Sequence, residues 1–408
     1  MTARDYPVFT LTPKAERSLK AGHPWVYGEE VTAVEGVYQN GDMVDVVSSK
    51  GRYLGSGWVN DHSKIRVRVI SRNANDTFDE AFFRRRVRYA LDYRKTVMGP
   101  TDYRCCRLIF GEADQFPGLT VDRFENVLVT QVLSLGMERR KDMVYRALVE
   151  LLREDGETID AIYERNDVAI RALEGLEQGK GFYPMEGLKT DLSGHVTITE
   201  NGIKYDVDYI EGQKTGFFLD QKYNRQAAAR LARGRRVLDC FTHTGAFALN
   251  AAAAGAQQVT AVDVSAFALE LAAENGRRNG LTNLDYKCAD VFDLLTEMAR
   301  EKKCGYDYII LDPPAFTKSR ATAKNAYHGY KEINRKAMRL LPRGGYLATC
   351  SCSHFMTDEM FRRMLQEAAL DAGVTLRQIE ARQQAPDHPI LPGVPETDYL
   401  KFYLLQVV

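Results

Sequence analysis

Residues 236–265, RVLDCFTHTGAFALNAAAAGAQQVTAVDVS, combine two short apolar strands with an alanine-rich helix between them. The first strand, RVLDCF, runs into a turn that contains Gly245, and the second strand, QVTAVDVS, is followed by another helical stretch. Further strand-like segments alternate with helices downstream, at LDYKCAD, YDYIILDPP and GYLATCSC, and TLRQIEARQ pairs with YLKFYLLQVV in a final hairpin. Such alternation is typical of parallel strands with helices on both faces. The sequence therefore predicts an α/β, Rossmann-like domain over residues 191–408.

Two regions of different pattern precede this domain. Residues 1–75 open with a short helix, PKAERSLKAG, and continue with strands separated by Gly, Asn and Asp, which predicts a small β-barrel. Residues 76–190 begin with the helical stretch DEAFFRRRVRYALDYRKTVM, and strands and a second helix follow, which predicts an α+β domain. We therefore expect three domains, with a hairpin turn at Asn201-Gly202 near the start of the third.

The composition excludes several classes of protein. The 55 basic and 55 acidic residues balance, so the net charge neither demands nor excludes a nucleic-acid partner. The 7 cysteines are odd in number and include no Cys-x-x-Cys pair, which argues against a disulfide framework and against structural zinc. No apolar run reaches the roughly 18 residues of a membrane span, and no signal peptide is apparent. We expect a cytoplasmic protein without a metal, and we interpret His243 and His354 as non-metal residues.

Several residues at the carboxyl ends of the strands predict a nucleoside cofactor, because open α/β sheets bind ligands there. Gly245 allows a ligand to approach the backbone, and the absence of a Gly-x-Gly-x-x-Gly fingerprint favours a phosphate-free nucleoside over a dinucleotide. Asp263 ends the second strand, where an acid suits ribose hydroxyls, and Asp290 ends the third, where it suits an adenine amino group. Each acid alone is equally well explained as a helix cap. The ordered set suggests S-adenosylmethionine.

Further cofactor candidates lie in the glycine turn and in GQKTGFFLDQKYNR, residues 212–225. An aromatic face at Phe217 or Phe218 suits a sulfonium cation or adenine, and the following acid and amide suit the methionine end of the cofactor. The alternative is a helix start whose phenylalanines belong to the core. The candidate cofactor residues are Phe217, Asp220, Gln221, Asp239, Phe241, Thr244, Gly245, Asp263 and Asp290.

The fourth and fifth strands end on chemically distinctive residues. Asp312 precedes two prolines, which stop the strand and stiffen the loop, so this acid is expected at the mouth of the crevice. An ordinary strand-ending turn is the alternative. Cys350 lies within the fifth strand and is expected to pack in the core, whereas Cys352 lies at its exit. Because neighbouring parallel strands bring their end loops together, we expect Asp312 and Cys352 to lie close to each other.

DPPAF, SCSH, the segment 212–225 and the closing DHP, PE and YLK resemble the RlmI-like family of ribosomal RNA cytosine-5 methyltransferases. The similarity spans the chain: the N-terminal KAERSLKAGHPWVYGEEV resembles that family's RNA-binding PUA domain, FPGLTVDRF and IYERND resemble its middle domain, and the remainder resembles its methyltransferase domain. The resemblance implies that Cys352 is the nucleophile and that Asp312 contacts the target base. It also implies S-adenosylmethionine as cofactor and large-subunit ribosomal RNA as partner, and it is compatible with a homodimer. Ala315 departs from the family, whose members often carry lysine there.

The residue types support the same chemistry independently. A thiolate that adds to carbon 6 of cytosine makes carbon 5 nucleophilic toward the cofactor's methyl group, and an acid near the ring nitrogen favours that addition. The thiol needs a lowered pKa, for which the sulfonium charge and the start of the following helix are candidates. RNA contacts are expected from basic residues that are individually better explained as solvated: Lys14, Arg17, Lys20, Arg84, Arg85 and Arg86.

Three alternative functions stay open at this point. A methyltransferase that acts on a base amino group or on guanine typically has an aromatic residue directly after the double proline, and here Ala315 precedes Phe316. A nicotinamide-dependent oxidoreductase would need the missing dinucleotide fingerprint. A non-catalytic RNA-binding protein would not require the acids and the cysteine at the ends of the strands.

Overall fold

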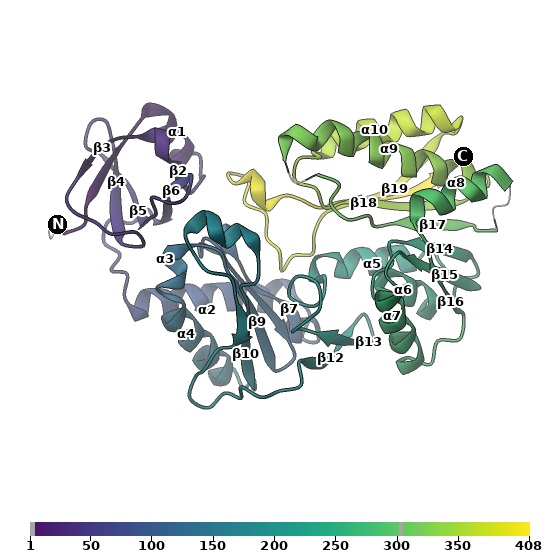
Figure 1. The fold of residues 1–408 in the computed structure, drawn as a ribbon, viewed down its shortest axis with the longest axis horizontal. Helices are drawn as coiled ribbons and strands as arrows, with labels where there is room; N and C mark the ends of the chain where they lie inside the picture. The colour runs from purple at the N-terminus through teal and green to yellow at the C-terminus, as the bar shows by residue number, and fades with distance from the viewer. Residues whose placement is uncertain (1–4, 302–304, 318) are drawn as a thin grey trace. The chain divides into compact units, whose positions relative to one another are not determined.

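The computed structural model describes residues 5–301, 305–317 and 319–408. The chain divides into two units, whose elements are labelled in Figure 1. The first unit contains the chain up to Ile198 together with Val207–Leu219 and Pro386–Thr397, and the second contains Thr199–Asp206, Asp220–Ala385 and Asp398–Val408. The backbone therefore passes from one unit to the other at five points along the sequence, after residues 198, 206, 219, 385 and 397.

The N-terminal part of the first unit is a six-stranded sheet in the order β2-β6-β5-β4-β1-β3. Helix α1 (Pro13–Lys20) begins as the sequence predicts, because the Thr12 side chain accepts a hydrogen bond from the Ala15 amide. The predicted strands are β4, β5 and β6, whereas three shorter strands have no clear sequence signature. The strands are β1 (Val8–Leu11), β2 (Trp25–Tyr27), β3 (Val31–Glu35), β4 (Met43–Ser48), β5 (Tyr53–Val59) and β6 (Ile65–Ser71).

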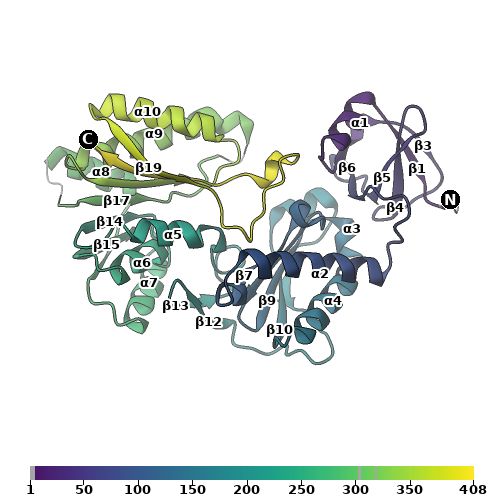
Figure 2. The same cartoon turned by 180° about the vertical axis from the view of Figure 1, so that it is seen from behind.

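A second sheet in the first unit has five strands in the order β11-β10-β9-β8-β7. Helices α2 and α4 cover one of its faces, and the apolar side of α2, including Phe82, Phe83 and Val87, is buried (Figure 2). The elements are α2 (Glu80–Val97), β7 (Cys105–Phe110), β8 (Leu119–Phe124), β9 (Val127–Val132), α3 (Leu135–Glu138), α4 (Lys141–Glu154), β10 (Ala161–Arg165) and β11 (Lys180–Phe182). The α+β pattern predicted for this part of the chain is confirmed.

The late segment Pro386–Thr397 is held in the first unit by buried polar contacts. Arg94 is fully buried, forms an ion pair with Asp114 and donates a hydrogen bond of 2.9 Å to the Asp387 carbonyl. The Arg107 amide donates to the Asp387 carboxylate at 2.9 Å. A buried charge is tolerated only with partners of this kind, so residues far apart in the sequence complete one core.

A two-stranded sheet, β12 (His195–Glu200) and β13 (Ile203–Asp208), precedes the large sheet in the sequence. Its turn residues Asn201 and Gly202 have φ of 54° and 79°, as a two-residue hairpin turn requires. The hairpin predicted from Asn-Gly is therefore confirmed.

The second unit is built on a seven-stranded sheet in the order β16-β15-β14-β17-β18-β20-β19. The first five strands in this order, β16, β15, β14, β17 and β18, are parallel to one another. Strand β20 lies between β18 and β19 and is antiparallel to both. Figure 1 shows α8, α9 and α10 on one face and α5, α6 and α7 on the other, as the α/β pattern predicts. The strands are β14 (Arg236–Cys240), β15 (Gln258–Asp263), β16 (Leu284–Cys288), β17 (Tyr308–Leu311), β18 (Tyr346–Ser351), β19 (Leu376–Arg382) and β20 (Lys401–Val407). The helices are α5 (Lys222–Ala229), α6 (Ala246–Ala253), α7 (Ala266–Arg278), α8 (Val291–Glu301), α9 (Ala323–Leu340) and α10 (Asp358–Ala372).

Each of the ranges 1–75, 76–190 and 191–408 contains one of the three larger sheets, and the division of the chain into three domains stays a prediction. Within the described ranges, no helix combines the length and the apolar character needed to cross a bilayer. The six cysteines in these ranges are free thiols, and Cys304 lies outside the described residues.

Candidate active site

The loops that follow β14, β17 and β18 open at the same edge of the seven-stranded sheet. β14 pairs in parallel with β17, and β17 pairs in parallel with β18. Parallel neighbours place their carboxyl ends together, which is where open α/β sheets bind ligands. The predicted proximity of the loops that carry Asp312 and Cys352 follows from this pairing.

Asp312 comes directly after β17 and is held by two hydrogen-bond donors. Its Oδ1 atom accepts from Gln221 Nε2 at 3.2 Å and from Cys350 Sγ at 3.0 Å. Pro313 and Pro314 lack amide hydrogens, so the strand cannot continue past the acid. Burial raises the pKa of Asp312 above its ordinary value, so the carboxyl keeps a proton to higher pH than an exposed aspartate. The side chain is thus oriented and poised to share a proton.

The two cysteines of TCSC occupy different environments. Cys350 lies inside β18 with 1% of its surface exposed, and its Sγ donates to the Leu311 carbonyl and to Asp312. Burial, followed by the charge of Asp312, raises the pKa of the Cys350 thiol well above its ordinary value. The expectation that Cys350 packs in the core is confirmed, and its proton serves as a donor. Cys352 is partly exposed and is the first residue after the strand, so it is the accessible thiol of the pair.

The loop between β18 and α10, here called the Cys352 loop, is stabilised by a buried lysine that the sequence did not predict. Lys401 on β20 is 5% exposed, and its Nζ donates to the Ser353 carbonyl at 2.7 Å and to the Tyr399 carbonyl at 2.8 Å. These bonds use two of the three hydrogens of the ammonium group. Burial lowers the pKa of Lys401 to about 8, and the charge of Cys352 is the largest opposing influence. The available sequence signal was the single charged residue of the mostly apolar strand KFYLLQV.

Phe316, the aromatic residue nearest the double proline, packs against other aromatic side chains of the protein. The Phe316 ring lies 4.5 Å from the Tyr330 ring and 5.9 Å from the Phe292 ring, measured between centroids. Tyr330, on α9, shares a hydrogen bond of 2.9 Å with the Ser353 hydroxyl. Phe316 therefore braces the helix that supports the Cys352 loop, which weighs against a methyltransferase that stacks a base on this ring.

Asp239, at the end of β14, presents an unsatisfied carboxylate oxygen. Its Oδ2 accepts from the Thr242 hydroxyl at 2.5 Å, and its buried Oδ1 has no hydrogen-bond partner among the residues that the structure describes. Burial raises the pKa of Asp239 to about 7, and the charges of Asp312 and Asp263 add to the increase. A buried acceptor without a partner is costly, so this oxygen fits a cationic donor from a ligand.

The glycine turn has a strained backbone of the kind found at functional sites. Phe241 and His243 have φ of 63° and 51°, although neither is glycine. Gly245 has φ of 86°, and a Cβ atom there would lie 2.5 Å from the Leu249 side chain. The positive φ favours glycine at this position, and a Cβ atom would also displace the Leu249 side chain. Thr244 lies partly buried in the same turn.

The two other predicted acids differ in their surroundings. Asp263 accepts at 2.9 Å from the amides of His243 and Ser265, one on each oxygen, and so joins the glycine turn to the start of α7. Asp290 is exposed, and its Oδ1 accepts from the Asp293 amide at 3.1 Å in the first turn of α8. The helix-cap interpretation therefore describes Asp290, and its contact with adenine stays a prediction.

The residues that the segment 212–225 contributes as cofactor candidates have different surroundings in the structure. Asp220 is buried and accepts from the Tyr399 hydroxyl at 2.7 Å. Gln221 directs its amide to Asp312, so it orients that acid. Phe217 belongs to the first unit, where it is buried, and Phe218 has the Lys214 ammonium 4.6 Å from its ring centroid. Cofactor contacts of these residues stay predictions.

The residues at this edge fit S-adenosylmethionine. Asp239 and Asp312 both have raised pKa values, and each is influenced by the charge of further carboxylates. Such a cluster is stabilised by positive charge, and the cofactor has both an ammonium and a sulfonium group. Contacts of Asp239 with the ammonium group and of Asp263 with the ribose hydroxyls stay predictions. Over the described ranges, no group of three or more His, Cys, Asp or Glu side chains is arranged to hold a metal ion.

Comparison with known proteins places this site in a family. The model of a PUA-like domain matches residues 9–72, and the model of an S-adenosylmethionine-dependent methyltransferase matches residues 184–405. Proteins named ribosomal RNA large subunit methyltransferase I are similar over the full chain. The protein from Pseudoalteromonas atlantica is 41% identical over 98% of this chain and 99% of its own, and that from Klebsiella pneumoniae is 39% identical over 100% of both.

Solved structures share the fold at lower sequence identity. A structure from Streptococcus mutans, provisionally assigned as a SAM-dependent methyltransferase, has a TM-score of 0.81, is 22% identical and covers 98% of this chain and 100% of its own. A methyltransferase complexed with SAH has a TM-score of 0.82 at the same identity and coverage. The chain is an S-adenosylmethionine-dependent methyltransferase and belongs to the ribosomal RNA large subunit methyltransferase I family.

Proposed function

We propose that the protein methylates carbon 5 of a cytosine in large-subunit ribosomal RNA through a covalent Cys352 adduct. The observation that carries the proposal is the difference in environment between the two cysteines. Cys350 is buried and donates a hydrogen bond to Asp312, whereas Cys352 is partly exposed and directly follows β18. A nucleophile and an oriented acid on adjacent strand ends are two of the groups that carbon-5 chemistry requires.

The proposed reaction starts with a bond between Cys352 Sγ and carbon 6 of the base. Asp312 donates a hydrogen bond to the ring nitrogen and so draws electrons away from carbon 6, which its raised pKa favours. Bound S-adenosylmethionine supplies the methyl group through its sulfonium. Loss of the carbon-5 proton to a base and expulsion of the Cys352 thiolate then restore the ring. Gln221 and Cys350 both donate to Asp312 Oδ1, which directs Oδ2 to the base.

Lys401 is proposed to favour the thiolate form of Cys352. A free thiol has a pKa near 8.5, and a neighbouring cation lowers this value. Lys401 provides a buried ammonium group that two carbonyls hold beside the Cys352 loop. Because the pKa of Lys401 is about 8, this residue carries its charge at neutral pH.

A trap with 5-fluorocytidine tests the proposed function. A transcript of large-subunit RNA that contains this base has no carbon-5 proton to lose, so the adduct should accumulate after methyl transfer. We expect a complex that survives denaturation, needs S-adenosylmethionine and yields a modified Cys352 peptide by mass spectrometry. The Cys288→Ser variant, which alters an exposed cysteine on β16, should still be trapped. Methylation at a base amino group, detected in digested RNA without any adduct, would contradict the proposal.

Binding of the product S-adenosylhomocysteine is expected to depend on pH through Asp239. This carboxylate is proposed to accept a hydrogen bond from the ammonium group of the ligand. Below about pH 7 the carboxyl gains a proton and loses its charge, so wild-type affinity should decrease as pH falls from 8 to 6. Asp239→Asn should weaken binding about tenfold at pH 8, since a hydrogen bond to a charged group contributes about 1.5 kcal/mol, and it should flatten the pH profile. Calorimetry measures both effects, with Asp285→Asn as the control, because Asp285 is an exposed residue on β16 that accepts a hydrogen bond from Gln258 at 2.8 Å. If affinity in Asp239→Asn depended on pH as it does in wild type, another group would be responsible for the titration.

We infer that the protein acts in the cytoplasm, where its described cysteines remain free thiols. Large-subunit ribosomal RNA is its proposed partner on the strength of full-length similarity to enzymes with that name. A homodimer stays a prediction.

A further inference from the structure

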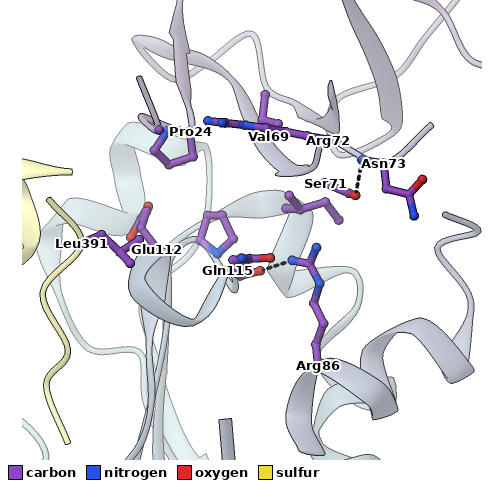
Figure 3. A pocket seen from close by; sticks show the side chains of 12 residues that line it. Pro24, Val69, Ser71, Arg72, Asn73, Arg86, Glu112, Gln115 and Leu391 are labelled. Atoms are coloured by element: carbon purple, nitrogen blue, oxygen red, sulfur yellow. Dashed lines mark hydrogen bonds between the residues drawn. The ribbon is translucent and has the colours of Figure 1, made fainter. Parts of the chain in front are cut away.

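Two cavities in the first unit share three of their lining residues. The first, of about 370 Å³, lies at the end of β6 beside the turn at Gly22 and Pro24, and the second, of about 360 Å³, runs along α2. Arg86, Gln115 and Leu391 line both cavities. Figure 3 shows Arg86 rising from α2 toward Gln115, with the end of β6 on the opposite side. We call this combined feature the α2 groove.

The acids that line the α2 groove are already engaged. Glu112 Oε1 accepts from Trp25 Nε1 at 2.9 Å and from Arg68 at 3.4 Å. Asp114 is paired with the buried Arg94, and its Oδ2 lies 2.7 Å from the guanidinium Nη2. Their negative charges are therefore balanced within the protein and contribute little to the potential in the groove.

The basic residues of the groove are not engaged in this way. Among the described residues, neither Arg72 nor Arg86 forms an ion pair with a carboxylate. Arg86 donates to the Gln115 carbonyl at 3.0 Å and lies 4.4 Å from the Phe82 ring centroid. Burial lowers the pKa of Arg86 to about 10, so it stays charged at neutral pH. Arg72 is exposed. Asp76 exerts an electrostatic influence on Arg86, and Arg72 and Arg86 together line the groove with positive charge, which suits a polyanion.

Helix α2 also presents exposed aromatic surface to the groove. Arg86, Tyr89 and Tyr93 are spaced three and four residues apart, so they form one stripe along the helix. Tyr89 is 64% exposed and Tyr93 is 38% exposed, although Arg94 lies over one face of Tyr93 at 5.1 Å. Pro389 and Ile390 line the same cavity. Exposed aromatic rings beside arginines are the combination by which proteins bind unpaired nucleotides.

We propose that the α2 groove binds a single-stranded segment of the ribosomal RNA substrate, with phosphates at Arg72 and Arg86 and a base stacked on Tyr89. The proposal rests on the proposed RNA substrate and adds a contact region in the first unit, apart from the candidate active site in the second unit. Charge selects RNA over an apolar peptide as the occupant, because the groove combines one well-exposed ring with two guanidinium groups that form no ion pair with a described carboxylate. Such stacking is tolerant of sequence, so the groove would set affinity and not the choice of cytosine.

Anisotropy with a labelled single-stranded oligonucleotide and with a matched duplex, both from large-subunit RNA, tests the groove. Tyr89→Ala should weaken single-strand binding about tenfold, and Tyr89→Phe should restore it because the ring is retained. Arg72→Ala should reduce the slope of log Kd against log salt by about one. Arg146→Ala, which removes an exposed arginine on α4 that pairs with Glu80 at 3.0 Å, is the matched control and should bind as wild type does.

Parallel assays separate the groove from the proposed chemistry. Every variant should bind S-adenosylhomocysteine with wild-type affinity, which verifies folding of the second unit. If the wild-type enzyme makes 5-methylcytosine while Tyr89→Ala and Arg72→Ala bind RNA normally, the groove proposal is wrong. If these variants bind free RNA normally yet methylate an assembled particle poorly, the occupant is a protein and the proposal is equally wrong. If the variants lose RNA affinity but the methylated product is not 5-methylcytosine, the groove stands and the proposed function fails.

Discussion

Cys352→Ser is expected to lower the rate of methyl transfer by about 10³-fold or more, because a serine hydroxyl is far less ionised and less nucleophilic than a thiol. Affinity for S-adenosylhomocysteine should be unchanged, since Asp239 and Asp263, the acids proposed to contact the cofactor, lie on other strand ends. Single-turnover transfer of a labelled methyl group to the RNA transcript measures the effect directly. The 5-fluorocytidine complex should also disappear.

The neighbouring cysteine supplies the matched control. Cys350→Ala removes a donor to Asp312 but leaves Cys352 in place, so it should retain the covalent complex and lose about tenfold in rate, as expected for the loss of one hydrogen bond. A Cys352→Ser variant with more than a tenth of wild-type activity would exclude this residue as the nucleophile. Loss of the adduct in Cys350→Ala alone would reverse the assignment of the two thiols.

Lys401→Met is expected to slow methyl transfer by about 10- to 100-fold near neutral pH, because removal of the cation raises the pKa of the Cys352 thiol by about one to two units. Methionine keeps the length of the side chain and suits a buried position. The distinguishing readout is the pH profile of Cys352 alkylation by iodoacetamide, which should move to higher pH in the variant. A purely structural role for Lys401 would leave that profile unchanged.

The pH at which wild type and Lys401→Met differ in rate depends on the charge of Lys401. The pKa of Lys401 is about 8, so its positive charge is present below this pH and is lost above it. Wild type and Lys401→Met should therefore differ most near pH 7 and converge above about pH 9, where the thiol ionises without help. Lys401→Arg retains a charge and should lie between them. Thermal unfolding serves as the control, because the methionine leaves the Ser353 and Tyr399 carbonyls without their donor.

The positions of Asp312 and Cys352 could be predicted because both depend on local signals. A run of apolar residues before Asp-Pro-Pro predicts where β17 ends, and strand–helix alternation predicts that β17 and β18 are parallel neighbours. The environment of Cys350 follows from the same strand assignment. These features need only the periodicity of the sequence and the geometry of a doubly wound sheet.

Features that depend on long-range pairing could not be predicted in this way. Lys401 reaches the Cys352 loop because β20 inserts between β18 and β19, and nothing in the sequence of β20 specifies that neighbour. Gln221 is expected at the cofactor, yet its amide contacts Asp312 from a segment before the first strand of the large sheet. Asp290 shows the converse case, in which a local helix cap accounts for an acid at a suggestive position.

The repeated passage of the backbone between the two units bears on the order in which they are completed during synthesis. The first unit lacks Pro386–Thr397 until roughly 190 residues after Ile198 have been added, an interval of about 10 to 40 s at ribosomal speed. During that time Arg94 and Arg107 are without Asp387, which holds both in the finished core. An N-terminal domain ordinarily folds while the rest of the chain is still being made. Here the N-terminal unit is complete only after residue 397 has been synthesised.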